Sequence, residues 1–184
     1  MTSTEDTIAA IATPIGQAGI GIIRISGPLS LEIAKKVFKP KTPQALPKSH
    51  RLYMGYVCDP HSGDIIDEVL LSFMASPNSY TREDVVEINS HSGYTLLSRI
   101  LAILTDLGAR MAKPGEFTQR AFLNGRIDLT QAEAVVDLMN ARSERGLVLA
   151  AQQIQGSIKR DTEALRKEAI HILANAEAAI DFPE

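Results

Sequence analysis

The sequence predicts an α+β protein in which strands and helices alternate up to about residue 112, after which only helices follow. Short runs rich in β-branched residues, separated by turns that contain glycine and proline, recur through this first part. A wide apolar stripe at helical spacing runs from Leu96 to Leu107 and ends at Gly108. From Thr130 onward the apolar residues keep helical spacing alone, which indicates a change of architecture near residues 113–135.

The composition predicts a substantial core and argues against several classes of protein. With 184 residues, of which 45% are hydrophobic, the chain can form one domain with an appendage or two small domains. A net charge of −3 argues against a protein that coats nucleic acid. The single cysteine, Cys58, excludes an internal disulfide and fits a reducing compartment. The N-terminal residues do not resemble a secretory signal, and no apolar run reaches membrane-spanning length, so we expect a cytoplasmic protein that does not bind membranes.

The first two strands are predicted at residues 7–12 and 21–26, joined by a turn with three glycines in residues 16–21. Because this turn leads into a strand and contains no lysine, a hairpin-like turn is favoured over a phosphate-binding loop. Arg24 interrupts the apolar second strand. Two interpretations stay open for it: a guanidinium that faces solvent, and one that points into a ligand cleft.

A helix is predicted from Ser30, its expected N-cap, to about Phe38. Residues 39–49 contain three prolines and are expected to form a surface loop. The alternating patterns at residues 51–59 and 65–74 predict a β-hairpin.

Residues 85–89 predict a short strand whose only ionisable residue is Glu87. This carboxylate either faces water or is partly buried against hydrogen-bond donors; the second arrangement is rarer because burying an unpaired charge is costly. Residues 90–93 lead into the apolar-striped helix, whose free N–H groups are suited to an anion. His91 at this position is interpreted either as a ligand contact or as a capping or packing residue. A short strand is expected at residues 109–112.

Residues 113–135 join the two parts of the chain and carry two arginines, Arg120 and Arg126. A turn at Pro114 precedes a short helix that is expected to stop at Asn124. We expect this helix to pack on the preceding part through its apolar side chains, Phe117, Ala121 and Phe122.

The next helix is predicted at residues 130–140. Either Asp128 or Thr130 is a suitable N-cap, and Thr130 would form a capping box with Glu133. Ser143 is expected to cap a further helical region that continues to Pro183, as one long helix or as two helices that break at Gly156. A helix of this length needs a neighbour, so it is either a long core helix or one helix of a bundle.

Five segments, in the same order along the chain, are similar to those of one protein family. They are DTIAAIATP at residues 6–14, GIGIIRISG at 19–27, NSYTREDVVE at 78–87, PGEFTQRAFLNGRIDL at 114–129 and AAIDFP at 178–183. The chain resembles the N-terminal part of the MnmE (TrmE) family of tRNA-modification GTPases, and the resemblance spans nearly the whole sequence.

The resemblance implies a mixed-sheet α+β domain, similar to the folate-binding part of aminomethyltransferases, at residues 1–118. The start of a helical domain is implied at residues 119–184. The first domain is expected to form a homodimer and to bind 5-formyl- or methylene-tetrahydrofolate. The family's folate-contacting positions fall on Arg24, Glu87 and Arg126, with no catalytic residue and no metal ligand expected in this chain.

For the full-length family protein, the resemblance implies GTP hydrolysis that depends on potassium and magnesium. Together with MnmG, an FAD-binding partner, such a protein would modify the wobble uridine of tRNA with a carboxymethylaminomethyl-type group. The folate would supply the one-carbon unit.

Two family features are missing from the 184 residues. There is neither a GxxxxGK[ST] phosphate-binding loop nor a guanine-reading Asn-Lys-x-Asp motif, and Cys58 does not match the family's C-terminal catalytic cysteine. We therefore expect the chain to be the N-terminal part of a larger protein, which by itself binds folate and self-associates without hydrolysing GTP. The alternatives are a stand-alone folate-dependent one-carbon transferase and a purely structural dimerisation module.

Overall fold

The computed structural model describes residues 6–14, 16, 18–42 and 47–182. The chain divides into two compact units, the first ending at Arg126 and the second beginning at Ile127. The division falls later than the expected boundary after residue 118, because helix α3 (Glu116–Leu123) is bonded to the first unit through its buried Arg120. We describe each unit by itself.

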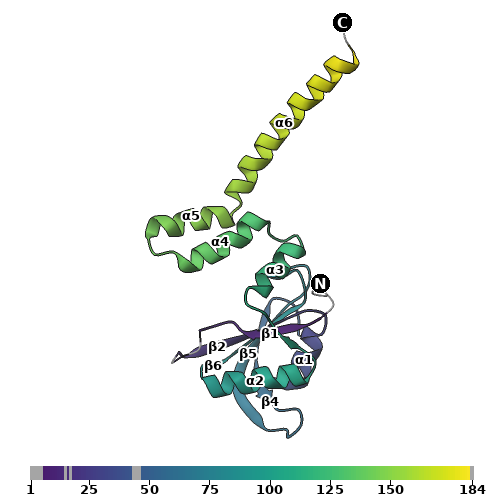
Figure 1. The fold of residues 1–184 in the computed structure, drawn as a ribbon. Coiled ribbons are helices and arrows are strands. Elements are labelled where there is room, and N and C mark those ends of the chain that lie inside the picture. Colours follow the sequence, from purple (N-terminus) through teal and green to yellow (C-terminus); the bar gives the residue numbers. More distant parts are fainter. Residues whose placement is uncertain (1–5, 15, 17, 43–46, 183–184) are drawn as a thin grey trace. The chain divides into compact units, whose positions relative to one another are not determined.

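A mixed sheet forms the centre of the first unit, and its described part has seven strands in the order β3-β4-β5-β6-β2-β1-β7 (Figure 1). Their bounds are β1 (Ile8–Ile11), β2 (Ile20–Ser26), β3 (Phe38–Pro40), β4 (Arg51–Cys58), β5 (Ile65–Met74), β6 (Val85–His91) and β7 (Arg110–Met111). Neighbouring strands are antiparallel except β1 and β7, which are parallel. The predicted α+β class and the β4–β5 hairpin are confirmed.

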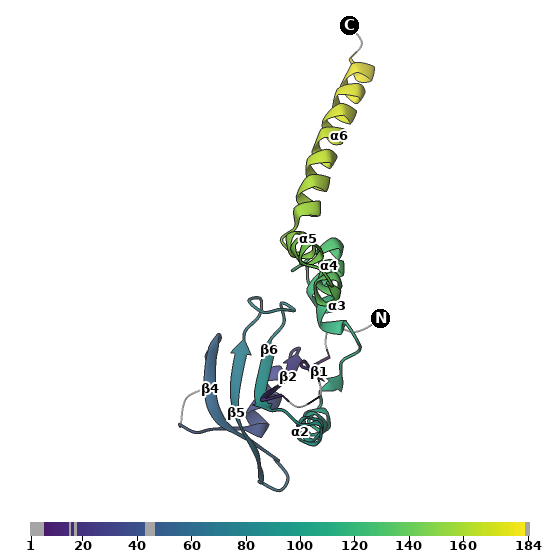
Figure 2. The same cartoon turned by 90° about the vertical axis from the view of Figure 1, so that its left-hand side faces the viewer.

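Helices α1 (Ser30–Val37) and α2 (Tyr94–Asp106) contribute to a single hydrophobic core with the sheet. Figures 1 and 2, which differ by a quarter turn, show α2 lying along one side of the strands. Ile23, Ile25 and Ile88 face this core and are 0% exposed. Because successive side chains of a strand point to opposite faces, the residues between them face away from these two helices.

Two local predictions in this unit were wrong. Phe38 leaves the helix and starts strand β3, which pairs with β4 within the stretch expected to be a loop. Ser30 is the first helical residue of α1 and its hydroxyl donates to the Gly27 carbonyl, 2.8 Å away, so it does not cap the helix. The side chain of Ser30 is buried, and the nearby carbonyl is the partner that satisfies it.

The second unit consists, in its described residues, of helices α4 (Leu129–Asn140), α5 (Glu144–Ile154) and α6 (Ser157–Asp181). Asp128 is the N-cap of α4 and forms a capping box with Gln131, so of the two alternatives Asp128 is correct. Ser143 caps α5 as predicted, through a bond from the Gly146 N–H. The helical region is broken at Gly156, whose φ of +79° suits glycine.

Helix α6 has no buried side chain among the described residues. Its apolar residues stay open to solvent, with Ile172 70% and Leu165 68% exposed. None of the described helices combines the length and the apolar character needed to cross a membrane.

Candidate functional site

Arg24 and Glu87 form an ion pair across two neighbouring strands. They are direct partners in the antiparallel register of β2 and β6, and both alternate with core residues. Nε and Nη2 of Arg24 each lie 2.7 Å from Oε1 of Glu87. The two side chains keep 28% and 22% of their surface exposed, so the pair lies half-buried on the face opposite α1 and α2. Within the described residues Oε2 of Glu87 has no hydrogen-bond partner, which leaves it available as an acceptor.

The ring of Tyr80 lies against both arginines that the sequence singled out. The Cζ atom of Arg24 is 5.4 Å from the ring centroid, and that of Arg126 is 4.8 Å away. Both distances are within the range of cation–π interactions. Phe117 adds a second aromatic ring, with its centroid 5.6 Å from Cζ of Arg24. The structure therefore brings Arg24, Glu87 and Arg126 into one cluster, with Tyr80 between its parts.

Sequence reasoning missed Tyr80 and misplaced two residues of α3. Tyr80 lies in a polar loop, where a single aromatic residue gives no periodic signal; its position between Pro77 and a charged run was the only clue. Phe117 is partly buried and contacts Arg24, while Phe122 is 39% exposed, so of the three expected anchors only Ala121 is fully buried. The anchoring of α3 is ionic.

A buried ionic cluster fixes α3 to the strands. Glu116 is 2% exposed and Arg120 3% exposed. Glu116 Oε1 accepts from Nη2 of Arg110 at 2.6 Å, and Arg120 donates to the carboxylate of Asp6 and, through Nη1, to Glu83 at 3.2 Å. Hydrogen bonds from Arg110 lower the pKa of Glu116 to about 2, against the effect of burial. The cluster thus pairs two arginines with three carboxylates, Asp6, Glu83 and Glu116.

The same cluster positions the loop that carries Tyr80. Glu83, at the end of the loop, also accepts from the hydroxyl of Ser26 at 2.6 Å. The hydroxyl groups of Tyr80 and Thr118 are 2.9 Å apart, and Nδ2 of Asn124 donates to the Thr81 carbonyl at 2.7 Å. The loop and α3 are therefore joined at several points, which restricts where the Tyr80 ring can lie.

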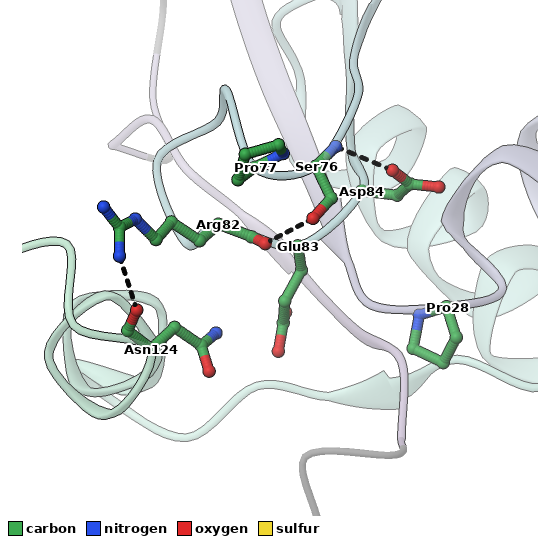
Figure 3. Close-up of a pocket in the computed structure, with 7 residues that line it drawn as sticks. All are labelled: Pro28, Ser76, Pro77, Arg82, Glu83, Asp84 and Asn124. Carbon is green, nitrogen blue, oxygen red and sulfur yellow. Dashed lines mark hydrogen bonds between the residues drawn. The ribbon is translucent and has the colours of Figure 1, made fainter.

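Two hollows lie around this loop. One has a volume of about 520 Å³ and is lined by Met74, Pro77, Asn78, Ser79, Tyr80, Arg82 and Arg126. The other, about 530 Å³, is lined by Pro28, Ser76, Pro77, Arg82, Glu83, Asp84 and Asn124 (Figure 3). We call them the basic hollow and the acidic hollow after their charged residues. Carboxylates in the acidic hollow already have partners: Glu83 binds Arg120 and Ser26, and Asp84 accepts from the Ser76 N–H at 2.9 Å.

His91 does not cap the helix that follows it. It is the last residue of β6, and its Nδ1 lies 2.8 Å from Asp67, whose hydrogen bond raises the pKa of the imidazole. The N-cap of α2 is Gly93, without a side-chain capping bond. In the described part of the chain, no group of three or more histidine, cysteine, aspartate or glutamate side chains is arranged to hold a metal ion.

Comparison with known proteins first defines the class. The model of the "GTP-binding protein TrmE N-terminus" matches residues 7–126, and the model of the "MnmE helical domain" matches residues 129–184. These two matches correspond to the two structural units. The chain thus has the N-terminal and helical domains of a GTP-binding protein.

Whole-chain relatives then define the family. The tRNA modification GTPase MnmE of Carboxydothermus hydrogenoformans is 52% identical over 98% of this chain and 40% of its own length. The proteins of the same name from Alkaliphilus oremlandii and Moorella thermoacetica are 50% and 53% identical, over 98% of this chain and 40% and 39% of their lengths. The chain belongs to the MnmE family of tRNA modification GTPases. It spans about two fifths of the length of these relatives.

Proposed function

We propose that this chain is the tetrahydrofolate-binding and self-associating part of a GTPase that modifies tRNA. The observation that carries the proposal is the cluster of Arg24, Glu87 and Arg126 around the ring of Tyr80. Three charged residues distant in sequence converge on a half-exposed aromatic surface, which is a suitable environment for a flat, polar, anionic ligand.

The donor and acceptor pattern of the cluster fits a pterin. One edge of the pterin presents a ring N–H beside an amino group, and a carboxylate accepts from both. Glu87 retains Oε2 as an acceptor while Oε1 is held by Arg24, so Arg24 orients the carboxylate. Tyr80 and Phe117 offer flat surfaces next to this carboxylate. We propose 5-formyl- or methylene-tetrahydrofolate as the ligand, which would supply a one-carbon unit to the tRNA modification.

The activity of the whole protein is the second part of the proposal. Relatives bear the name tRNA modification GTPase, and we propose that the full-length protein hydrolyses GTP with potassium and magnesium in its GTPase domain. We further propose that it acts in the cytoplasm with the FAD-binding partner MnmG on the wobble uridine of tRNA. The residues of this chain contribute the folate site and the self-association.

An exposed apolar row supports self-association. Met54 and Leu70 are register partners on β4 and β5, and Leu52 lies on the same face. They are 51%, 39% and 64% exposed, on the sheet face that also carries Glu87. Apolar residues that adjoin in this way mark interaction surfaces. We propose that a second copy of the chain covers this face.

Calorimetric titration with 5-formyltetrahydrofolate tests the folate site. We expect saturable binding. Glu87→Gln keeps the shape of the side chain but removes its charge, and it should weaken binding at least about tenfold. The neutral amide has only one accepting oxygen, and its NH2 group donates where the carboxylate would accept from the ligand. Lys35→Glu, at an exposed position of helix α1 on the other face of the sheet, is the matched control and should bind normally. Tight binding that Glu87→Gln leaves unchanged would exclude this site, and no binding would favour a purely structural module.

Light scattering tests the self-association. The unmodified chain should have twice the monomer mass at micromolar concentration, and Leu70→Glu should yield monomers because a buried carboxylate has no partner there. The control Lys35→Glu should stay dimeric. A monomeric unmodified chain contradicts the proposal.

A further inference from the structure

We propose that Arg82, together with Arg126, binds the carboxylates of the ligand's glutamate tail in the basic hollow. This inference rests on the proposed folate binding. It specifies the orientation of the ligand, with the pterin at Glu87 and the glutamate tail at Arg82. No residue of this hollow other than Arg126 entered the site predicted from the sequence.

Arg82 and Arg126 lie next to each other at the end of α3. Nη1 of Arg82 donates to the carbonyl of Asn124 at 3.1 Å (Figure 3). A Cβ atom added to Gly125 would be 3.6 Å from the same nitrogen. Arg126 is the next residue in the chain, and both arginines line the basic hollow. Two arginine side chains thus line the same hollow beside the turn that follows α3.

Neither guanidinium is neutralised within the described residues. No carboxylate lies within 4.0 Å of either one, and the described lining of the basic hollow contains no acidic side chain. This contrasts with Arg110 and Arg120, each of which has at least two carboxylate partners. Two neighbouring cations repel each other, and an anion between them removes the repulsion and gains charge-assisted hydrogen bonds. The basic hollow is therefore suited to an anion, while the acidic hollow on the other side of Arg82 is not.

The backbone of Arg82 points to the same assignment. Its φ is +60°, a left-handed conformation that costs a non-glycine residue about 1 kcal/mol or more. Glycine would adopt it without strain, so the arginine side chain is present at a cost to stability. Within the described residues the side chain makes one hydrogen bond, to the Asn124 carbonyl, and its other N–H groups remain available to a ligand.

The neighbours of the two arginines identify the part of the ligand. Met74, Pro77 and Tyr80 give the basic hollow an apolar and aromatic side, and its volume of about 520 Å³ is in the range of small-molecule sites. Tetrahydrofolate continues from its pterin into a benzoyl group and then a glutamate with two carboxylates. Tyr80 lines this hollow and also contacts Arg24, so it connects the pterin end at Glu87 with the tail end at Arg82.

The test uses two ligands and three variants in calorimetric titration. The ligands are 5-formyltetrahydrofolate and 5-formyltetrahydropteroate, which lacks the glutamate. Arg82→Gly removes the guanidinium and also relieves the strained φ, which offsets the loss of its bond to the Asn124 carbonyl in the stability of the loop. Arg82→Lys keeps the charge without the two-pronged geometry. Arg99→Ala, an exposed arginine on α2 paired with Asp59, is the matched control.

We expect Arg82→Gly to weaken binding of the glutamate-bearing ligand about tenfold and to leave binding of the shortened ligand unchanged, because only the former contacts the guanidinium. Arg82→Lys should recover part of the loss, and Arg99→Ala should match the unmodified chain with both ligands. If Arg82→Gly changes both affinities equally or neither, while Glu87→Gln still weakens binding, the tail assignment is wrong and the folate site stands. If the unmodified chain binds neither ligand, both proposals are overturned.

Discussion

Arg24 and Glu87 lie directly opposite each other on antiparallel strands β2 and β6, joined by two contacts of 2.7 Å although 63 residues separate them in sequence. Strand register alone places them so. A shift of β2 by one residue would turn Arg24 into the core and both Ile23 and Ile25 out of it. Because these isoleucines are fully buried, such a shift would expose them at a large cost in stability. The hydrophobic core on one face thus determines the polar pair on the other.

The ring and the hydroxyl group of Tyr80 make different contacts, so their roles can be tested separately. Tyr80→Phe keeps the ring near Arg24 and Arg126 but loses the bond to Thr118, so we expect normal folate binding and a loss of about 1 kcal/mol in unfolding free energy. Tyr80→Ala removes the ring and should weaken binding as well. Calorimetry and urea denaturation measure the two effects. Equal binding by both variants would show that the ring takes no part.

Glu116 is the residue on which the ionic cluster depends most. Glu116→Gln deprives Arg110 and Arg120 of the buried carboxylate that they share, although both keep Asp6, and we expect a loss of about 3 kcal/mol in unfolding free energy. This value is at the lower end for such pairs, since Arg120 keeps Asp6 and Glu83. Glu32→Gln, which breaks an exposed pair with Lys36, is the control and should cost less than about 0.5 kcal/mol. Similar losses in both variants would contradict a buried ionic anchor.

The same carboxylate predicts how stability depends on pH. The pKa of Glu116 is about 2 in the folded chain and 4.5 in the reference state. Because the folded pKa is the lower one, this contribution is complete above about pH 5 and is lost as the pH falls toward 2. A series of urea denaturations between about pH 6 and about pH 3, the range in which carboxylates titrate, should show a steeper decline for the unmodified chain than for Glu116→Gln. Parallel curves would mean that Glu116 does not carry this dependence.

A substitution at Gly55 tests the pairing of β3 with β4, a strand pair that was not predicted from the sequence. A Cβ atom at this position would lie 2.4 Å from the Lys39 carbonyl and 2.5 Å from the Phe38 ring. We expect Gly55→Ala to push β3 away from β4 and to lower the unfolding free energy by about 1–3 kcal/mol. Gly19→Ala, where nothing lies within 4 Å, is the matched control and should be close to neutral. Thermal denaturation distinguishes the two, and equal melting temperatures would contradict the β3–β4 pairing.

The elements that the sequence predicted well have strong periodic signals. The β4–β5 hairpin, α2 and the cap of α5 follow from alternation, from an apolar stripe and from a serine before a helix. Strand β3 was missed because it has only three residues and includes a proline, and its pairing with β4 is a tertiary contact. The expected anchoring of α3 was right for Ala121 and wrong for Phe122, because the other buried positions are occupied by Glu116 and Arg120, and the partners of Arg120 include Asp6 and Glu83, which are distant in sequence.

The sequence by itself determined the α+β class and the family, because periodicity and motif order are properties of the chain alone. Through the family resemblance it also predicted Arg24, Glu87 and Arg126 as ligand contacts. Only the tertiary structure decided that Arg24 neutralises Glu87, since this requires the β2–β6 register. It also decided that Tyr80 contacts both arginines, and that Arg82 joins Arg126 in a hollow without carboxylates. The contacts of Tyr80 and Arg82 depend on the packing of a loop against α3, and packing between segments far apart in sequence leaves no local pattern to read.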